Sequence, residues 1–351
     1  MKMSTEPGTG VAFLRNIGLM MTYRCQAACP HCVVEAGPHR KEEVSLEEAL
    51  GWIDQMAAYR DGHIAALSLT GGEPFCCLEK LKETTRHAAQ LGMVVTTVTN
   101  GFWATTVREA VSVLAELKGL KMIGISADPH HQAFIPFDRV RNAVAAAREC
   151  GLEYRIIVTC EDDTSPEYRA FRARLEEVSP EEHIQPVTTF IAGRAKDEID
   201  GARCRTSPAP CQARCEAVGS PVVFPNGQVV ACIGALIALP THHPLVLGNL
   251  RHQPLKEILD KAEGNAILHG LRVWGPGRLV SMIEQSEARS ELPDRYIDDV
   301  ICDPCYRIMS NGKLARWVER LAADSEYIRT VAYGRAYFLN EGDMLGYLGW
   351  H

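Results

Sequence analysis

The sequence lacks the features that would place the protein on nucleic acid, in a membrane or outside the cell. Its 351 residues carry 37 Lys and Arg against 44 Asp and Glu, a net charge of −7, so it has no basic footprint for nucleic acid. The longest apolar run, residues 229–239, is too short to span a bilayer. Residues 1–10 are polar and have no apolar core of a signal peptide. We therefore expect a cytoplasmic protein without nucleic-acid or membrane partners.

A secreted disulfide framework is also missing, although the chain holds 13 cysteines. Most of them fall in clusters rather than being spread along the chain, which fits a reducing compartment and points to metal binding. The isolated cysteines are interpreted as small buried hydrophobic residues without iron, and Cys204 receives no role. These isolated residues are Cys76, Cys77, Cys150 and Cys160.

The first cluster is Cys25, Cys29 and Cys32, spaced C-x3-C-x2-C. It follows the apolar run 16–23, which predicts a buried strand with the cysteines on the loop at its C-terminal end. Three thiolates can hold three corners of a [4Fe–4S] cube and leave the fourth iron open to a ligand. A zinc site is the alternative, but zinc usually closes with four ligands arranged in C-x2-C pairs. The spacing therefore favours a cluster with one open iron.

Strand-like and helix-like segments alternate from residue 17 to about residue 190. Six such units predict right-handed βαβ crossovers and a parallel sheet. Ser45 and Glu48 indicate a capped helix start. Strands are predicted at 17–23, 64–69, 93–98, 120–126, 154–159 and 184–190, and helices at 44–60, 78–91, 106–117, 137–150 and 166–177.

The cysteine spacing resembles that of the radical S-adenosylmethionine (SAM) enzymes, and Thr70-Gly71-Gly72-Glu73-Pro74 resembles their GGE motif. The resemblance implies an α/β fold with an open, TIM-like partial (β/α)6 barrel, whose chemistry collects at the C-terminal strand ends. It also implies that SAM binds the open iron and is cleaved reductively to a 5′-deoxyadenosyl radical, which abstracts hydrogen from a substrate.

The resemblance further implies roles for residues at the strand ends. Gly71, Gly72 and Glu73 would receive the methionine amino group. His31, where the family usually has an aromatic residue, would pack near adenine. Other SAM contacts are expected from Asn100, from Ser126 at the ribose, and from Arg139 or Arg141 at the carboxylate.

Four further residues are expected to face the substrate. Asp128, His130 and His131 follow the fourth strand and would line the cavity. Arg194 lies in an Ala-Gly-Arg-Ala turn after the sixth strand, where it would bind an anionic group. Adjacent histidines and a lone arginine are also common on solvated loops, which is the alternative interpretation.

The second half resembles the SPASM and twitch domains that follow many radical SAM barrels. Phe224 to Cys232 predicts a β-hairpin around a Pro-Asn-Gly turn. The opening pattern C-x9–15-G-x4-C fits from either Cys211 or Cys215, and only one later C-x2-C is present. This implies a small α+β domain with one auxiliary [4Fe–4S] cluster, or zinc on the same thiolates. The candidate ligands are Cys211, Cys215, Cys232, Cys302 and Cys305.

The predicted domains are a barrel at 1–196, an auxiliary cluster domain at 197–310 and a helical tail at 311–351. A helix is predicted at 254–262, and one amphipathic helix in the tail from Leu314, Trp317, Val318 and Leu321. We assign no chemistry to the tail.

SPASM and twitch relatives mostly modify peptides, so the resemblance favours peptide maturation through a crosslink, epimerisation or oxidation. A flavodoxin or ferredoxin-type electron donor is implied. Because the first strand begins near residue 17, we expect no N-terminal domain that binds a leader peptide. This weakens the peptide interpretation but leaves room for a separate leader-peptide-binding protein. The alternatives are a radical dehydrogenase of sugars or aminocyclitols and a non-catalytic iron–sulfur electron carrier. The carrier would need neither the GGE motif nor an open iron.

Overall fold

The computed structural model describes residues 13–239 and 243–349. Residues 1–10, whose composition argued against a signal peptide, lie outside these ranges. Within them, no helix has the length and apolar character needed to cross a membrane.

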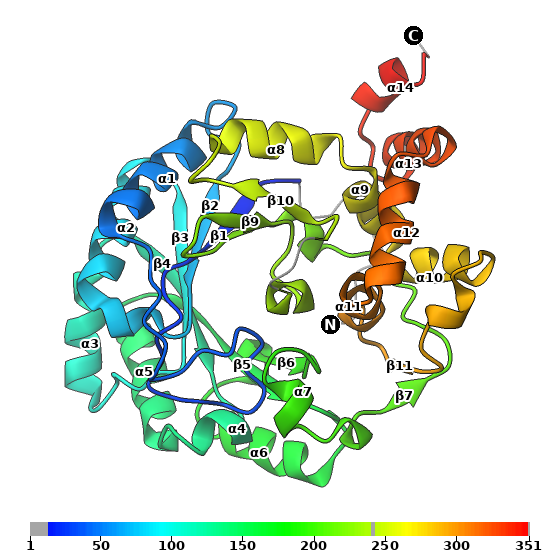
Figure 1. Cartoon of the computed structure of the whole chain (residues 1–351). Helices are drawn as coiled ribbons and strands as arrows, with labels where there is room; N and C mark the ends of the chain where they lie inside the picture. Colours follow the sequence, from blue (N-terminus) through cyan, green and yellow to red (C-terminus); the bar gives the residue numbers. More distant parts are fainter. Residues whose placement is uncertain (1–12, 240–242, 350–351) are drawn as a thin grey trace.

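The centre of the molecule is a sheet of nine strands in the order β10-β9-β8-β1-β2-β3-β4-β5-β6, curved as in an open barrel (Figure 1). Strands β1 to β6 are parallel neighbours in chain order, which confirms the mixed α/β fold and the six predicted strands. The strands are β1 (Asn16–Met20), β2 (Ala66–Thr70), β3 (Val94–Thr99), β4 (Leu120–Ser126), β5 (Glu153–Cys160), β6 (Ile184–Thr188), β8 (Val222–Val223), β9 (Gln228–Val230) and β10 (Val246–Asn249).

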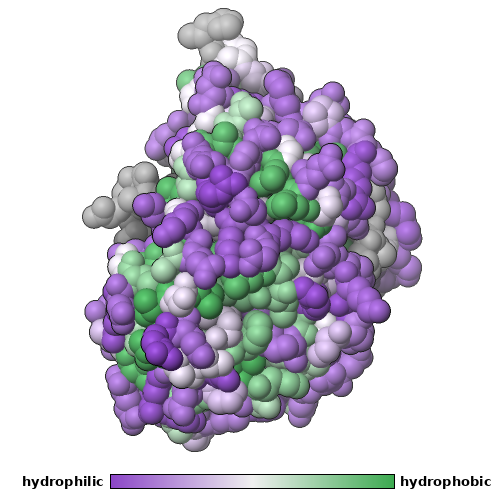
Figure 2. Space-filling model, turned by 90° about the vertical axis from the view of Figure 1, so that its left-hand side faces the viewer, coloured by the Kyte–Doolittle hydropathy of each residue, from purple (hydrophilic) through white to green (hydrophobic). Residues whose placement is uncertain are grey.

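Helices of the first half cover the outer side of the curved sheet (Figure 1). Those longer than one turn bury apolar residues, as α1 does with Trp52, Ile53 and Met56. Hydrophilic and hydrophobic residues intersperse on the outward face (Figure 2). The predicted capping box of α1 is present, because Ser45 and Glu48 cap each other's backbone N–H. The helices are α1 (Leu46–Ala58), α2 (Leu78–Gln90), α3 (Val107–Glu116), α4 (Pro129–Gln132), α5 (Phe137–Glu149) and α6 (Pro166–Glu176). Only the single-turn α4 has no counterpart in the prediction.

The predicted hairpin forms as β8 and β9, which pair antiparallel around the turn that contains Gly227. Strand β8 also pairs parallel with β1, through Gly18 and Val222. The barrel sheet therefore continues past residue 196, and the domain boundary there stays a prediction.

The second half is more helical than the sequence indicates. Helix α8 and the tail helix α12 match predictions, whereas the other helices after residue 262 have no counterpart among them. The remaining elements are α7 (Ala195–Glu198), α8 (Leu255–Glu263), α9 (Ala266–Trp274), α10 (Pro276–Glu284), α11 (Cys302–Ser310), α12 (Gly312–Ala322), α13 (Ser325–Phe338), α14 (Asp343–Tyr347) and the strand pair β7 (Thr206–Ser207) and β11 (Tyr296–Ile297).

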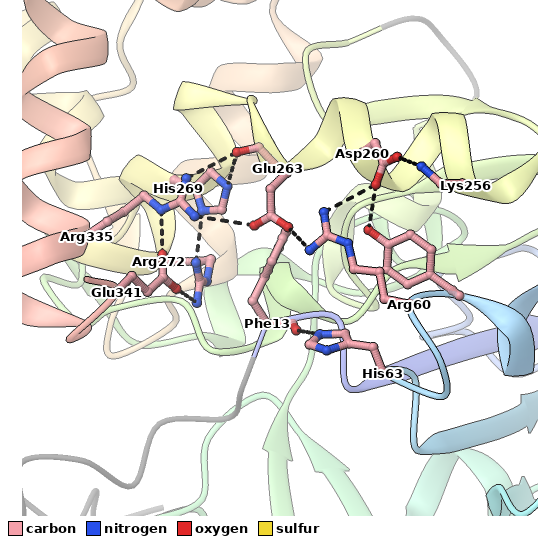
Figure 3. Close-up of polar contacts among 11 residues, drawn as sticks. Phe13, Arg60, His63, Lys256, Asp260, Glu263, His269, Arg272, Arg335 and Glu341 are labelled. Atoms are coloured by element: carbon pink, nitrogen blue, oxygen red, sulfur yellow. Dashed lines mark hydrogen bonds and ion pairs between the residues drawn. The ribbon is translucent and has the colours of Figure 1, made fainter. Parts of the chain in front are cut away.

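A polar network joins the barrel to the C-terminal helices (Figure 3). Glu263, the last residue of α8, accepts from Arg60 of the barrel at 2.6 Å and pairs with Arg335 of α13 at 3.3 Å. Arg335 is 7% exposed and also pairs with Glu341 at 2.5 Å. Removing one partner would leave a buried charge unpaired, so the network fixes the tail against the barrel.

Candidate active site

The three cysteines lie on the loop between β1 and α1, at the C-terminal edge of the sheet. The loop closes on itself through a bridge between Arg24 and Gly37, and the Cys25 N–H donates to the Gly37 carbonyl at 3.3 Å. Cys25 and Cys29 are each 7% exposed, and Cys32 is partly exposed. The short closed loop thus holds the three thiols together with little exposure to solvent.

Hydrogen-bond donors point at these sulfurs. The Ala27 N–H lies 3.4 Å from the Cys25 Sγ, the Ala36 N–H lies 3.3 Å from the Cys32 Sγ, and the Asn100 amide lies 3.6 Å from the Cys25 Sγ. Burial raises the pKa of Cys25 to about 12, against which the Ala27 N–H lowers it. A buried thiol ligates as a thiolate only when a cation compensates its charge, and N–H donors stabilise that thiolate. The donor set fits an iron–sulfur cluster.

The distances between possible ligand atoms show where a single ion could be held. A tetrahedral zinc with Zn–S bonds of 2.3 Å places its sulfurs about 3.8 Å apart. Within residues 13–239 and 243–349, one group of three or more ligand atoms lies within 4.8 Å of one another, and it consists of His31, Asp128 and His131. Neither set of cysteines forms such a group.

The two glycines of the GGE motif pack against the chain that leads into the cysteine loop. A Cβ on Gly71 would lie 2.7 Å from the Thr22 carbonyl oxygen, and one on Gly72 would lie 2.6 Å from that of Arg24. The Gly72 N–H donates to the Thr22 carbonyl at 2.6 Å. The absence of side chains at these glycines was expected to let a ligand approach the backbone. In the structure it also lets the neighbouring cysteine loop pack closely against them.

Glu73 is fully buried at the end of β2 and joins it to the end of β3. Its Oε1 accepts from the Thr99 hydroxyl at 2.7 Å and the Phe75 N–H at 3.2 Å, and its Oε2 accepts from the Asn100 N–H at 2.8 Å. Burial raises its pKa to about 7, although these hydrogen bonds lower it. A carboxylate offers about four acceptor positions, so one on Oε2 is left for a ligand donor.

Asn100 is tied into the cysteine loop rather than left free at the strand end. Its Oδ1 accepts from the Gln26 amide at 2.9 Å and from the Phe102 N–H at 3.1 Å. Gln26, a residue within the cysteine motif, is a site residue that the sequence reasoning missed. Its hydrophilic side chain, placed between Cys25 and Ala27, was the feature of the sequence that could have indicated a role in the site.

His31 meets the histidines of the β4 end. Its ring centroid lies 5.0 Å from that of His130 and 4.7 Å from that of His131. Burial lowers its pKa to about 3, and its Nδ1 is buried without a hydrogen-bond partner in the part of the chain that the structure describes. The neutral imidazole thus keeps one polar atom unpaired at the place where a bound cofactor would lie.

Each of the other two histidines has its own carboxylate. The Nδ1 of His131 lies 2.7 Å from Asp128, which is fully buried and caps α4, and the Nε2 of His130 lies 2.8 Å from Glu161. His131 holds the pKa of Asp128 well below its usual range although burial acts to raise it, and Glu161 raises the pKa of His130. Glu161 was also missed, although it lies two residues after the predicted fifth strand.

The structure separates the two arginines that the sequence leaves open. Arg141 is half-exposed and lies 3.6 Å from Asp138 and 3.6 Å from Glu177. Arg139 has a buried Nη1 that finds no hydrogen-bond partner among the described residues. An unpaired buried guanidinium nitrogen needs an acceptor, which favours Arg139 as the anion-binding residue. Ser126 ends β4 and is partly exposed, as a ribose contact would require.

The second cysteine set lines a pocket between the hairpin, α9 and the start of α11. The thiols in its wall are those of Cys215, Cys232, Cys302 and Cys305. Burial raises the pKa of all four, to about 12 for Cys215, and the neighbouring thiols raise it further for Cys215, Cys232 and Cys305.

Backbone N–H groups again face these thiols. Hydrogen bonds from Gly234 and Ala235 lower the pKa of Cys232 and Cys302, respectively, against the effect of burial. Cys211 is not part of the pocket wall, although its thiol acts electrostatically on Cys302. The geometry favours Cys215 over Cys211 as the fourth ligand.

A comparison with protein families matches residues 19–166 to the Radical SAM superfamily. The chain is 24% identical over 137 residues to "Putative peptide biosynthesis protein YydG" of Bacillus subtilis, which covers 38% of the chain and 42% of that protein. It is 37% identical over 89 residues to the PqqA peptide cyclase of Rhizobium meliloti, covering 25% and 23%. It is 32% identical over 128 residues to the Fe-coproporphyrin III synthase of Methanosarcina barkeri, covering 36% and 30%.

The chain spans less than half the length of each of these relatives. The family match begins in β1 and ends at the start of α6, and it includes the three-cysteine loop and the GGE motif. Residues 19–166 are therefore a radical SAM domain.

Proposed function

We propose that the chain is a radical SAM enzyme that modifies a peptide by a crosslink, epimerisation or oxidation. The observation that carries the proposal is the convergence of the first strand ends on one loop. Residues after β2 and β3 bond the loop of Cys25, Cys29 and Cys32, and those after β4 reach His31 within it. Two relatives carry peptide biosynthesis and peptide cyclase in their names, which supports a peptide substrate.

Members of the superfamily bind a [4Fe–4S] cluster and SAM, and the three thiols with their N–H donors fit such a cluster. When bound, the cluster and SAM supply a 5′-deoxyadenosyl radical that removes a hydrogen atom from the substrate. The chain supplies placement and exclusion of side reactions. Its thiolates would leave one iron open, because only three ligands lie on the loop.

Several residues of the barrel would place SAM. The free acceptor position on the Glu73 Oε2 suits the amino group, and the orphaned Nη1 of Arg139 suits the carboxylate. His31 would face the adenine and Ser126 the ribose. In this arrangement the buried polar atoms that lack protein partners acquire them from the cofactor.

The histidine–carboxylate pairs would form the substrate side of the cavity. A carboxylate on one ring nitrogen fixes the orientation of the imidazole, so that the other nitrogen is aimed. Asp128 does this for His131, and Glu161 does it for His130. We assign both imidazoles to hydrogen bonding with polar groups of the substrate.

The second cysteine set would hold an auxiliary [4Fe–4S] cluster through Cys215, Cys232, Cys302 and Cys305. Its role would be to accept the electron that remains on the substrate after hydrogen abstraction. A flavodoxin or ferredoxin-type donor would reduce the open-iron cluster, and a separate protein would present a leader peptide.

The test is an anaerobic reconstitution followed by SAM cleavage with deuterated candidate substrates. We expect 5′-deoxyadenosine to form with a chemical reductant and to carry deuterium from a peptide, because the radical takes its hydrogen from the substrate. If 5′-deoxyadenosine instead carried deuterium from a sugar or aminocyclitol, the result would contradict a peptide substrate and support small-molecule dehydrogenation. Absence of SAM cleavage in protein with full iron loading would leave an electron carrier.

Removing the carboxylate of Glu73 should weaken SAM binding. A charge-assisted hydrogen bond to an ammonium group is worth roughly 1.5–3 kcal/mol, so Glu73→Ala should lower the affinity about ten- to a hundredfold and leave the iron content unchanged. Equilibrium titration of the reconstituted protein with SAM measures the effect. Glu79→Ala on α2, where the side chain is 85% exposed, is the control. Wild-type affinity in Glu73→Ala would remove Glu73 from the SAM site.

A further inference from the structure

A side chain from beyond β6 holds the three-cysteine loop from the opposite edge of the barrel. Arg194 donates from Nη1 to the Cys29 carbonyl at 2.8 Å and from Nη2 to the Ala36 carbonyl at 2.6 Å. Its backbone N–H donates to the Cys32 carbonyl at 3.2 Å. We expected Arg194 to bind an anionic group, and the structure instead directs its hydrogen bonds to the loop at three points.

The backbone next to Arg194 is shaped for this contact. Gly193 has a φ of +59°, and a Cβ there would lie 2.2 Å from the Val33 carbonyl oxygen and 2.8 Å from that of Cys32. Any other residue would push the turn away from the loop. Gly193 and Arg194 therefore form one attachment between the end of the sheet and the cysteines.

The charge of Arg194 is only weakly neutralised by the protein. Its side chain is 12% exposed, and its ion pair is with Glu198, at 3.9 Å and with a carboxylate that is 49% exposed. An ion pair to so exposed a carboxylate is weak. The guanidinium is instead directed at the loop, where it donates to the carbonyls of Cys29 and Ala36.

We propose that Arg194 is a positioning residue of the open-iron cluster, which fixes the loop that carries the thiolates and raises the reduction potential of the cluster. The inference rests on the proposed function in taking that cluster as present. Reduction adds an electron to a group that its thiolates already make anionic, and a nearby positive charge favours the reduced form. Arg194 would thus ease the delivery of the electron on which SAM cleavage depends.

The test compares Arg194→Gln, which removes the charge, with Arg194→Lys, which keeps it. Glu198→Gln is the control on the same turn. Each protein is reconstituted anaerobically, its iron is counted, and a reductive titration is followed by electron paramagnetic resonance. The change that SAM makes in the signal identifies the open-iron cluster.

We expect Arg194→Gln to shift the potential downward, so that at the wild-type midpoint the reduced fraction falls from about half to about a tenth. Arg194→Lys should shift much less, and Glu198→Gln should match the wild type. Wild-type iron content and potential in Arg194→Gln, or an equal shift in Arg194→Lys, would overturn the inference. If Arg194→Gln loses its iron outright, retained iron in Arg194→Lys supports the inference and lost iron overturns the role of the charge. No substrate is needed, so failure to find a peptide substrate would leave this result standing.

Discussion

A Cys29→Ala protein should form no 5′-deoxyadenosine above background. The three thiols of the β1–α1 loop are the ligands available to the open-iron cluster, and two ligands cannot hold a cube that must also expose an iron to SAM. We choose Cys29 among the three cysteines because its thiol is buried in the middle of the motif and its carbonyl accepts a hydrogen bond from Arg194. We therefore expect loss of both the cluster and SAM cleavage.

The iron content of the Cys29→Ala protein must be measured together with its SAM cleavage. The variant should lose about four irons and keep those of the second cysteine pocket. Cys150→Ala is the matched control, since Cys150 caps α5 and its thiol faces the Val111 carbonyl at 3.8 Å, away from the loop. Full SAM cleavage by Cys29→Ala protein would refute the assignment of the loop as the cluster site.

The first half of the fold could be predicted because its signals are local. Apolar runs, the Ser45 capping box and the glycines after helices mark each βα unit, and parallel strands then place their C-terminal ends together. From that rule alone, the cysteine loop, Glu73, Asn100 and Asp128 are expected at one edge of the sheet. The structure confirms this common edge.

What could not be predicted depends on partners distant in the chain. Hydrophobic periodicity does not show which strands pair with each other, so the pairing of β8 with β1 could not be predicted. A strand-end arginine suggests an anion, whereas Arg194 finds carbonyl groups 158 and 165 residues away. The carboxylates of the histidine pairs required the same three-dimensional information, because Glu161 is 31 residues from His130.

The second large effect concerns the auxiliary pocket. A protein with Cys25, Cys29 and Cys32 all changed to Ala should keep about four irons of the wild-type eight, two cubes of four. It should also show a reducible cluster by electron paramagnetic resonance. Its four protein ligands leave no open iron, so SAM should not perturb the signal.

Single substitutions then identify the ligands of that cluster. In the triple variant, Cys302→Ala or Cys215→Ala should remove the remaining iron, because both thiols lie in the pocket wall, whereas Cys211→Ala should retain it. In the otherwise wild-type protein, Cys302→Ala should preserve SAM cleavage yet block product formation if the cluster accepts the substrate electron. Zinc on the same thiolates is the alternative that the metal content decides. A triple variant that contains zinc, or no metal at all, would contradict the auxiliary cluster. If Cys211→Ala lost the iron and Cys215→Ala retained it, the fourth ligand would be Cys211 instead of Cys215.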